Sequence, residues 1–526
     1  MRPSQQDRMD PYERFIWRET RPGTWQRDID EPEHFYAAIA KLHEGSGRMF
    51  FAMTGHISLT VAIAKSESRV DEEKRLENAF QQGWIRLRYE QPTIASRVEY
   101  DPATDKFIKT YQACRDHVEQ DSWLNTTLKP ICTEQTSDEW CNSDPPAPKL
   151  PTLFILKPPS TAADDSDGLL RRDLVLRSPH DTMDGIGTLH LLNRLIAHIS
   201  SAYSEVLTPK DLLCDGSESI NLSPPLRVAA AIPPTPTPDE RARLQEIAAA
   251  KTARIQESIG IEEMGIPYKQ GAVVPGRHQR VEHTLSVEDT KLLLAACKAS
   301  NVTVTHAFHA GIAIALRDVQ DRKETSRRAS YSTYLLRNER DHCLTPYNTA
   351  MYAAAVYHSS SSTGLAVNMI IPASGDEDED EASKQKEYMR ILYIMRDFYH
   401  KSRDDPNHVA LAPYLWADSI SSIPEEALRS KLPPPVPPPS SVPSVSISSM
   451  GKIDTIITPT NGVFEIYNPW VTGEELRNGF GLFLGTFRDH LCLSGAFNDA
   501  WHDEDEAVSF LYRCKDVVFK GLGINF

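Results

Sequence analysis

The sequence has no excess of positive charge. Its 57 lysine and arginine residues are outnumbered by 73 aspartate and glutamate residues, which gives a formal net charge of −16 at pH 7. Proteins that bind phosphate backbones or anionic membranes through charge alone carry the opposite balance. We therefore expect no nucleic-acid partner and no membrane partner.

Long apolar segments are also missing. No stretch of 18 or more apolar residues is present, as a membrane-spanning helix would require. The first residues, MRPSQQDRMDPYERF, lack the apolar core of a signal peptide. These features predict a cytoplasmic protein.

Cysteine is scarce, and the common nucleotide-binding and nucleophile motifs are absent. The eight cysteines form no C-x-x-C pair, so the sequence predicts neither a zinc site nor a redox motif, and most of the thiols should be buried and free. We find no phosphate-binding P-loop, no dinucleotide glycine fingerprint and no G-x-S-x-G elbow. Kinase, dehydrogenase and serine-hydrolase functions therefore have no support in the sequence.

What the sequence does contain is enough apolar material for a large folded protein. Of its 526 residues, 40% are hydrophobic and 25% charged, and this length predicts two or more packed units. Apolar residues at three- and four-residue steps predict helices over Val70–Tyr89, ended by Pro92, and over Ile186–Tyr203. β-Branched and aromatic residues predict strands over Thr93–Tyr100, Lys106–Tyr111, Thr152–Leu156 and Asp173–Arg177, with a turn at Asp101–Asp105 between the first two.

A proline-rich segment divides this first part from a second part of similar composition. The residues Ile232–Pro238 can continue neither a sheet nor a helix, and a charged helix through Ala249 is expected after them. In the second part we expect a strand from Arg280, a helix over Lys291–Ala299 with Ser286 and Asp289 in capping-box spacing, and a helix over Val304–Leu316. Strands and helices are thus mixed in both parts.

One short motif in the first part contains candidate catalytic residues. After the predicted strand that ends at Arg177, the chain reads His180-Asp181-Thr182-Met183-Asp184-Gly185 and then enters the predicted helix. The pattern is H-x-x-x-D-G. A loop between a strand and a helix can present a side chain into a cleft, so His180 is a candidate functional residue.

This motif resembles that of the H-x-x-x-D-G acyltransferase superfamily, which includes chloramphenicol acetyltransferase, the plant and fungal hydroxyl acyltransferases and the condensation domains of peptide synthetases. The segments Trp84–Ala95 and Ser446–Gly451 make the sequence look most like fungal trichothecene 15-O-acetyltransferases. The resemblance implies an α/β fold of two chloramphenicol-acetyltransferase-like halves with a central substrate channel. The halves would be residues 1–231, which carry the motif, and 280–526, joined by a crossover linker over 232–279. The plant-type D-F-G-W-G motif is missing.

The resemblance also implies roles for the motif residues. A neutral imidazole accepts a proton at cytosolic pH, so His180 would be the general base that deprotonates an acceptor hydroxyl as it attacks a thioester. Asp184 would make an ion pair that fixes the loop, with Arg337 and Arg340 as alternative partners, and Gly185 would allow special backbone torsions or close packing. The developing oxyanion needs hydrogen-bond donors, for which Ser448 or Ser449 is a candidate.

Several other polar residues invite a functional interpretation but are better explained structurally. His306 and His309 share helical spacing without a third metal ligand, so we expect packing or helix-end roles and no metal site. His502 stands beside acidic residues at an expected solvated helix start. Ser359–Ser362 looks like a polar turn. The acidic run Asp376–Glu381 and the proline-rich Pro424–Pro443 are expected to be solvated loops.

The function implied is acetyl transfer from acetyl-CoA to a hydroxyl group of a fungal secondary metabolite, either a terpenoid such as a trichothecene or a polyketide. No permanently bound cofactor is expected, since acetyl-CoA is a co-substrate. One alternative is amide or ester formation from a carrier-protein-bound acyl donor, as in condensation domains. Another is a catalytically silent scaffold of the same fold. A chain that carries both halves can complete its own channel, so we expect a monomer.

Overall fold

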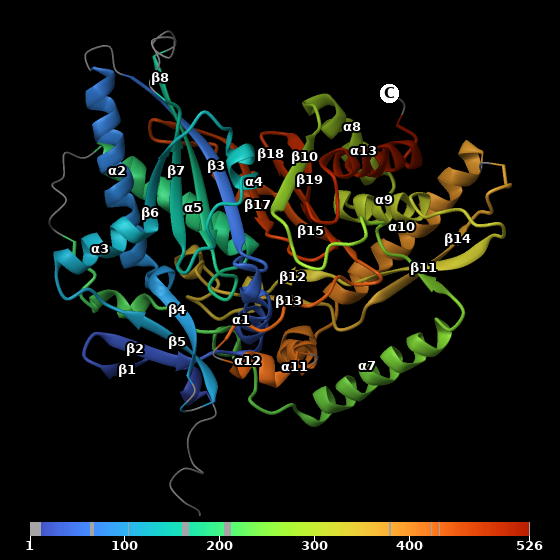
Figure 1. The fold of residues 1–526 in the computed structure, drawn as a ribbon, viewed down its shortest axis with the longest axis horizontal. Coiled ribbons are helices and arrows are strands. Elements are labelled where there is room, and N and C mark those ends of the chain that lie inside the picture. Colours follow the sequence, from blue (N-terminus) through green and yellow to red (C-terminus); the bar gives the residue numbers. More distant parts are fainter. Residues whose placement is uncertain are drawn as a thin grey trace, which may run out of the picture.

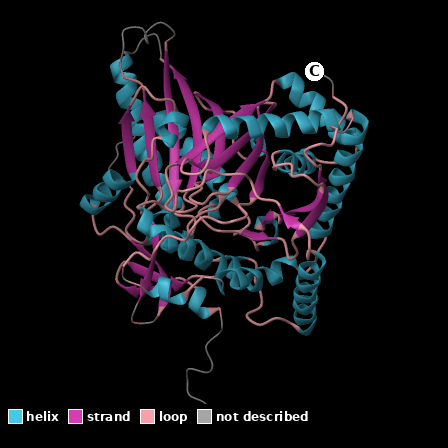
Figure 2. Ribbon diagram, turned by 45° about the vertical axis from the view of Figure 1, so that its right-hand side comes forward, coloured by secondary structure: helices cyan, strands magenta, loops and turns pink. Residues whose placement is uncertain are grey.

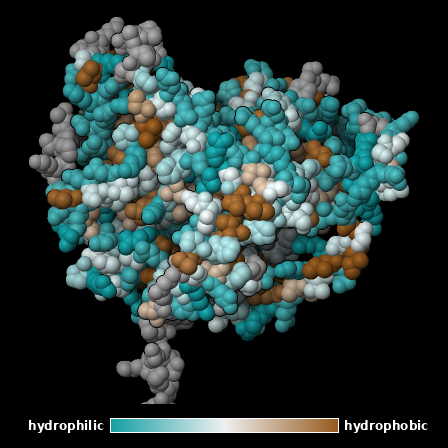
Figure 3. Space-filling view, viewed as in Figure 1, coloured by the Kyte–Doolittle hydropathy of each residue, from teal (hydrophilic) through white to brown (hydrophobic). Residues whose placement is uncertain are grey.

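The computed structural model describes residues 12–63, 68–101, 103, 105–159, 168–204, 212–377, 380–421, 423–430 and 432–524. Two large β-sheets lie side by side in it, with helices packed around them (Figures 1 and 2). The mixed α/β architecture expected from the sequence is confirmed. The molecular face seen in Figure 3 is mainly hydrophilic, with small, separate apolar groups.

The first large sheet has six strands in the order β16-β17-β3-β8-β7-β6. Their bounds are Thr460–Asn461, Phe464–Gly473, Met53–Ala62, Leu169–Ser178, Thr152–Lys157 and Leu128–Cys132. Helices α2 (Arg69–Glu90) and α5 (Gly185–Ser204) bury their apolar stripes in the same core cluster as strand β3. Both helices cover the ranges that the three- and four-residue periodicity predicts.

The second large sheet has four strands in the order β10-β19-β18-β15. Their bounds are His278–Thr284, His490–Asn498, Phe480–Phe487 and Val445–Lys452. Its core is shared with helices α8 (Val287–Ala299), α9 (Val304–Asp318), α10 (Glu381–Arg403) and α13 (Glu504–Gly521). The predicted cap is present, because the Asp289 amide donates to the Ser286 hydroxyl at the start of α8, 3.0 Å away.

Strand β17 comes from late in the sequence but belongs to the first sheet. It pairs antiparallel with β3 from Phe464 opposite Val61 to Gly473 opposite Met53, with a bulge between Tyr467 and Trp470. Strand β18, which follows it in the chain, belongs to the second sheet. The two sheets are therefore neighbours at β17 and β18. The division into halves at residues 231 and 280 stays a prediction.

Smaller sheets and helices surround this frame. The small sheets contain β1 (Arg18–Arg21), β2 (Thr24–Asp28), β5 (Lys106–Gln112) and β4 (Ser96–Asp101); β14 (Leu365–Ile371), β11 (Arg327–Thr333) and β9 (Glu262–Glu263); and β12 (Leu336–Asn338) with β13 (His358–Ser360). The remaining α-helices are α1 (Glu31–His43), α3 (His117–Thr127), α4 (Ser137–Asn142), α6 (Leu226–Ala229), α7 (Pro238–Glu257), α11 (His408–Ser421) and α12 (Glu425–Arg429). None of the helices within the described ranges is both long and apolar enough to cross a bilayer.

Three local predictions need correction. The predicted strand Thr93–Tyr100 begins as a 3-10 turn over Pro92–Ala95, because proline at the first position favours a helical turn, and β4 starts only at Ser96. The acidic run is a loop only in part, since Asp380 caps α10, and residues 378 and 379 lie outside the described residues. The proline-rich segment contains the short helix α12 before its extended portion.

The proline-rich connection after Ile232 leads into the expected charged helix, α7, which begins at Pro238. The cysteines are free, and six of the eight are buried; Cys132 is exposed and Cys492 is half-buried. The expectation of mostly buried thiols is confirmed.

Candidate active site

The H-x-x-x-D-G segment forms the connection between strand β8 and helix α5. Strand β8 ends at Ser178 and α5 begins at Gly185, each within one residue of the bound that the sequence predicts. Asp184 caps the helix, because its carboxylate accepts a hydrogen bond of 2.7 Å from the amide of Gly187. This cap fixes the direction in which the loop leaves the strand, and so the position of His180.

His180 lies at a cavity of about 450 Å³ between the two large sheets. The first sheet and the elements packed near it contribute Tyr36, Met53, His180, Asp184, Gly185 and Val471 to its lining. The second sheet contributes Ser446, Ser448, Met450, Gly481, Phe483 and Ala496. A histidine in a mainly apolar cleft with a few polar groups is the usual arrangement of a small-molecule site.

The imidazole of His180 is neutral and has one open nitrogen. Burial and the neighbouring His358 lower its pKa to about 3, against smaller opposing effects from the local backbone and Asp184. Its Nδ1 is buried without a hydrogen-bond partner among the residues that the structure places. The other ring nitrogen, Nε2, is not among these completely buried atoms. It is therefore the nitrogen available to a molecule in the cavity.

Asp184 pairs with Arg340, which decides between the two arginines left open by the sequence. Arg340 Nη1 lies 3.0 Å from Oδ1 and 2.9 Å from Oδ2 of Asp184, and both side chains are buried. Burial alone would raise the pKa of Asp184, but Arg340 and His358 outweigh it and lower the pKa. The other candidate, Arg337, donates to the carbonyl oxygen of Ser402, 2.5 Å away, and lies 3.7 Å from the carboxylate of Glu339.

The carboxylate of Asp184 also accepts from the backbone amide of Tyr357, 2.8 Å away. It thereby joins the loop of His180 to strand β13, which starts with His358. One buried side chain thus binds its own helix, Arg340 and the neighbouring strand.

Gly185 and Gly187 make close packing possible at the start of α5. A Cβ atom on Gly185 would lie 3.2 Å from Val471 Cγ2, so close packing is the relevant property here; Gly185 is not among the described glycines with positive φ. The constraint at Gly187 is stronger, because a Cβ there would lie 2.3 Å from the carbonyl oxygen of Ala353. The sequence analysis did not single out Gly187.

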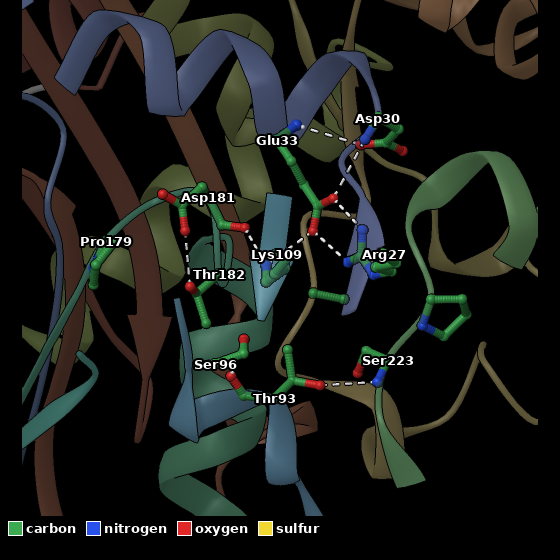
Figure 4. Close-up of polar contacts among 12 residues, drawn as sticks. Arg27, Asp30, Glu33, Thr93, Ser96, Lys109, Pro179, Asp181, Thr182 and Ser223 are labelled. Atoms are coloured by element: carbon green, nitrogen blue, oxygen red, sulfur yellow. Dashed lines mark hydrogen bonds and ion pairs between the residues drawn. The ribbon is translucent and has the colours of Figure 1, made fainter. Parts of the chain in front are cut away.

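A buried cluster of charges supports the loop from the other side (Figure 4). Lys109 Nζ donates to the carbonyl oxygen of Asp181, 2.6 Å away, and pairs with Glu33 Oε1 at 2.9 Å. Arg27 binds both oxygens of Glu33, at 2.6 and 2.7 Å. Burial would raise the pKa of Glu33, but Arg27 and Lys109 lower it to about 2. Glu33 is on α1, so the cluster ties this helix to the residue after His180.

Helix α1 also supplies the side chain in closest ring contact with His180. The Tyr36 ring stacks on the imidazole, with ring centroids 3.6 Å apart and planes inclined by 12°. Its hydroxyl lies 3.0 Å from Nε2 of His358. Neither Tyr36 nor His358 was identified in the sequence analysis, because no local pattern links them to His180.

The two candidate serines lie on β15 with different surroundings. Ser449 Oγ is 3.0 Å from the hydroxyl of Thr305 on α9. Both serines line the cavity, and the described residues offer no hydrogen-bond partner to the Ser448 hydroxyl. Because successive side chains of a strand point to opposite faces, Ser448 points away from α9. Of the two, Ser448 is therefore the one with a free hydroxyl for a bound molecule.

A second cavity of about 440 Å³ lies between β17 and the β18–β19 pair. It shares Met450, Val471 and Phe483 with the cavity of His180. These three side chains therefore form a common wall between two spaces, next to Gly185.

The remaining candidates from the sequence have structural contacts. His306 accepts from the Thr303 amide at the start of α9, and His309 is hydrogen-bonded to three hydroxyl groups, among them that of Tyr399, so their packing and helix-end roles are confirmed. His502 precedes α13 as expected but is buried, with Nε2 2.9 Å from the carbonyl oxygen of Asn478, so the expected solvation is wrong. Within the described part of the chain, no group of three or more His, Cys, Asp or Glu side chains is placed to hold a metal ion.

The predicted polar turn Ser359–Ser362 is wrong at its start, because Ser359 and Ser360 belong to strand β13. Ser359 is buried, and its hydroxyl lies 2.6 Å from His408 Nε2 and 2.5 Å from Glu339 Oε1. It takes part in a buried polar contact between β13, the loop after β12 and helix α11.

Comparison with known proteins places these features in context. No protein-family model matches the chain. It is 26% identical over 515 residues to O-acetyltransferase pigM of Monascus ruber, covering 97% of this chain and 88% of that protein. It is 23% identical over 515 residues to acetyltransferase pigO of Monascus ruber, covering 97% and 98%.

Solved structures show the fold. The TRI3 trichothecene 15-O-acetyltransferase from Fusarium sporotrichioides superposes with a TM-score of 0.77 at 17% identity, covering 98% of this chain and 99% of that chain. The first condensation domain of the calcium-dependent antibiotic synthetase superposes with a TM-score of 0.55 at 12% identity, covering 95% and 97%. The predicted α/β fold of two chloramphenicol-acetyltransferase-like halves is thereby confirmed.

Proposed function

We propose that this chain is an O-acyltransferase that moves an acetyl group from acetyl-CoA to a hydroxyl group of a fungal secondary metabolite. Two relatives named as acetyltransferases align with almost the whole chain, which supports the reaction class. The observation that carries the proposal is the neutral imidazole of His180, whose Nε2 is open to a cavity between the two sheets. A neutral, positioned imidazole is what general-base activation of an alcohol requires.

In the proposed reaction, His180 Nε2 accepts the proton of the acceptor hydroxyl while the hydroxyl oxygen bonds to the thioester carbonyl carbon. The tetrahedral intermediate then collapses as the carbon–sulfur bond breaks. His180 returns its proton to the departing thiolate, which gives the ester and free coenzyme A. No acyl-enzyme is formed, so both substrates are bound together.

The surrounding residues have separate roles in this proposal. Asp184 and Arg340 hold the loop and do not exchange protons with the substrates, because the carboxylate is already engaged by a guanidinium and two backbone amides. Ser448 is proposed to donate a hydrogen bond to the oxyanion, as its hydroxyl is free at the cavity. A donor placed in this way contributes typically 10²–10³-fold to the rate.

The acceptor is proposed from the names of the relatives. One curated relative, 23% identical over 366 residues, is named azaphilone biosynthesis cluster protein M of Aspergillus terreus. The TRI3 structure is named for a trichothecene substrate. Both point to hydroxylated secondary metabolites, and the mainly apolar cavity walls suit such acceptors. We propose that the chain acts as a cytoplasmic monomer on acetyl-CoA and one of these acceptors.

Product analysis by mass spectrometry tests the proposal. The purified protein is incubated with acetyl-CoA and a panel of hydroxylated azaphilones, trichothecenes and other fungal terpenoids and polyketides. We expect an acetylated product, and a decrease of about 100-fold or more in the His180→Ala variant, because the base is lost. His283→Ala is the matched control, since His283 packs on Tyr512, away from the cavity, and should leave the rate unchanged.

Two results would contradict the proposal in different ways. Equal product from the wild-type and His180→Ala proteins would show that His180 is not the base. Product formed only when the acetyl group is supplied on a phosphopantetheinylated carrier protein would favour the condensation-domain type of reaction.

A further inference from the structure

His358 lies in the same cavity as His180 but has no role in the reaction described above. The two imidazole centroids are 5.6 Å apart, and both rings contact Tyr36. The Trp416 ring packs edge-on against His358, with centroids 5.5 Å apart and planes inclined by 85°. His358 is therefore held firmly, with only 8% of its surface exposed.

The hydrogen bond with Tyr36 is linked to which nitrogen of His358 carries the proton. Burial raises the pKa of Tyr36 well above its usual value, so its phenol is protonated and able to donate a hydrogen bond to His358 Nε2. Burial lowers the pKa of His358, and the nearby Arg340 adds to this against the opposing Asp184 and Glu339, so the imidazole is neutral. When Nε2 accepts from the Tyr36 hydroxyl, the one ring proton of His358 resides on Nδ1.

The Nδ1 atom of His358 is open to the cavity. Among the described residues, none is a hydrogen-bond partner of this nitrogen. The nitrogen is also not completely buried. His358 is part of the cavity wall. An open nitrogen of His358 thus lines the same cavity as the open Nε2 of His180.

The positions of the two imidazoles are coupled. Asp184 is in the His180 motif, and its carboxylate accepts from the amide of Tyr357, the residue before His358. Tyr36 stacks on one ring and bonds to the other. The acceptor nitrogen and the donor N–H are thus held by common supports from α1, the His180 loop and β13, which suits two groups that act on one reaction centre.

We propose that His358 is a further catalytic residue, which donates a hydrogen bond from Nδ1 to the oxyanion that forms as the acceptor attacks the thioester. This inference rests on the proposed acyl transfer. A neutral imidazole is a suitable donor, because it stabilises the oxyanion without giving up its proton. Tyr36 is a positioning residue in this scheme, since it acts through His358 and His180.

Steady-state kinetics of three variants test the donor. His358→Leu removes the N–H group, and we expect kcat to fall 100-fold or more with KM changed less than threefold, because the contact forms only in the transition state. His358→Asn places an amide N–H near the position of Nδ1 and should recover at least tenfold of the lost kcat. Tyr36→Phe should lower kcat by about tenfold. Each variant is compared with the wild type by thermal unfolding, so that a misfolded protein is recognised.

The outcomes separate this inference from the proposed function. If the wild type acetylates an acceptor and His358→Leu keeps kcat within threefold, or if His358→Asn is no better than His358→Leu, the donor role is wrong and acyl transfer stands. If the wild type makes no product, the acyl-transfer proposal is the one that fails.

A spectroscopic measurement reads the tautomer independently of activity. In two-bond ¹H–¹⁵N spectra of histidine-labelled protein, with His358→Asn used for assignment, we expect His358 to be protonated at Nδ1. Protonation at Nε2 would overturn the inference, because Nε2 could then not accept the hydrogen bond of Tyr36.

Discussion

Removal of Arg340 tests how far the active-site loop depends on its buried ion pair. In Arg340→Met, the carboxylate of Asp184 keeps its two backbone amide donors but loses both contacts to the guanidinium, at 2.9 and 3.0 Å. Loss of one partner of a buried pair typically costs about 3–5 kcal/mol, since the remaining charge stays buried. For 526 residues, the unfolding entropy is about 1.1 kcal/mol per kelvin, so Tm should fall by about 3–5 °C if the chain unfolds as one unit.

Thermal unfolding followed by circular dichroism measures this loss, and a double-mutant cycle isolates the pair. Asp184→Asn combined with Arg340→Met should lose less stability than the sum of the single variants, because neither charge is then left buried alone. Arg337→Met is the matched control and should lose less than half as much, since Glu339 keeps its contact of 2.8 Å with His408. Additive losses, or an equal loss for Arg337→Met, would refute the assignment of Arg340 as the partner.

Three further predictions concern the loop, the oxyanion site and the response to acid. Gly187→Ala should lower Tm by several degrees although alanine favours helices, because its Cβ would lie 2.3 Å from the carbonyl oxygen of Ala353; an unchanged Tm would contradict this contact. Ser448→Ala should lower kcat about 100-fold at constant Tm, whereas Ser449→Ala should leave kcat unchanged; the reverse pattern would transfer the donor role to Ser449. Burial lowers the pKa of His309 to about 3. Only the unfolded chain then takes up this proton below pH 6.5, so stability is full above that pH and falls by about 1.4 kcal/mol at pH 5.5. The decrease in Tm between pH 7.5 and 5.5 should be smaller in His309→Gln, and an equal decrease would show that His309 does not cause it.

The sequence predicts those parts of the site that depend on local pattern. The apolar periodicity that defines α5 and the strand-like residues before Ser178 place the His180 loop correctly, because both patterns depend on neighbouring residues. The local pattern cannot choose between Arg337 and Arg340, since a short turn after β12 decides which of them faces Asp184.

Contacts between distant segments could not be predicted from the sequence. Tyr36 and His358 are far from His180 in the chain and meet it only after α1 and β13 have packed around the cavity. The buried position of Lys109 was equally hidden, because a lysine on a strand normally indicates an exposed face. Residues of this kind are recognised from tertiary contacts, since no spacing rule connects them.

The place of strand β17 in the first sheet has a consequence for protein engineering. A chimera that joins the first half of this protein to the second half of a relative at the linker would receive a foreign β17 against its own β3. Every backbone hydrogen bond of that pairing could form, but the side chains of β3 and β17 that share a core cluster with α5 would come from two different proteins. In such a chimera, residues 460–473 are therefore best kept together with the first half, as a discontinuous building block.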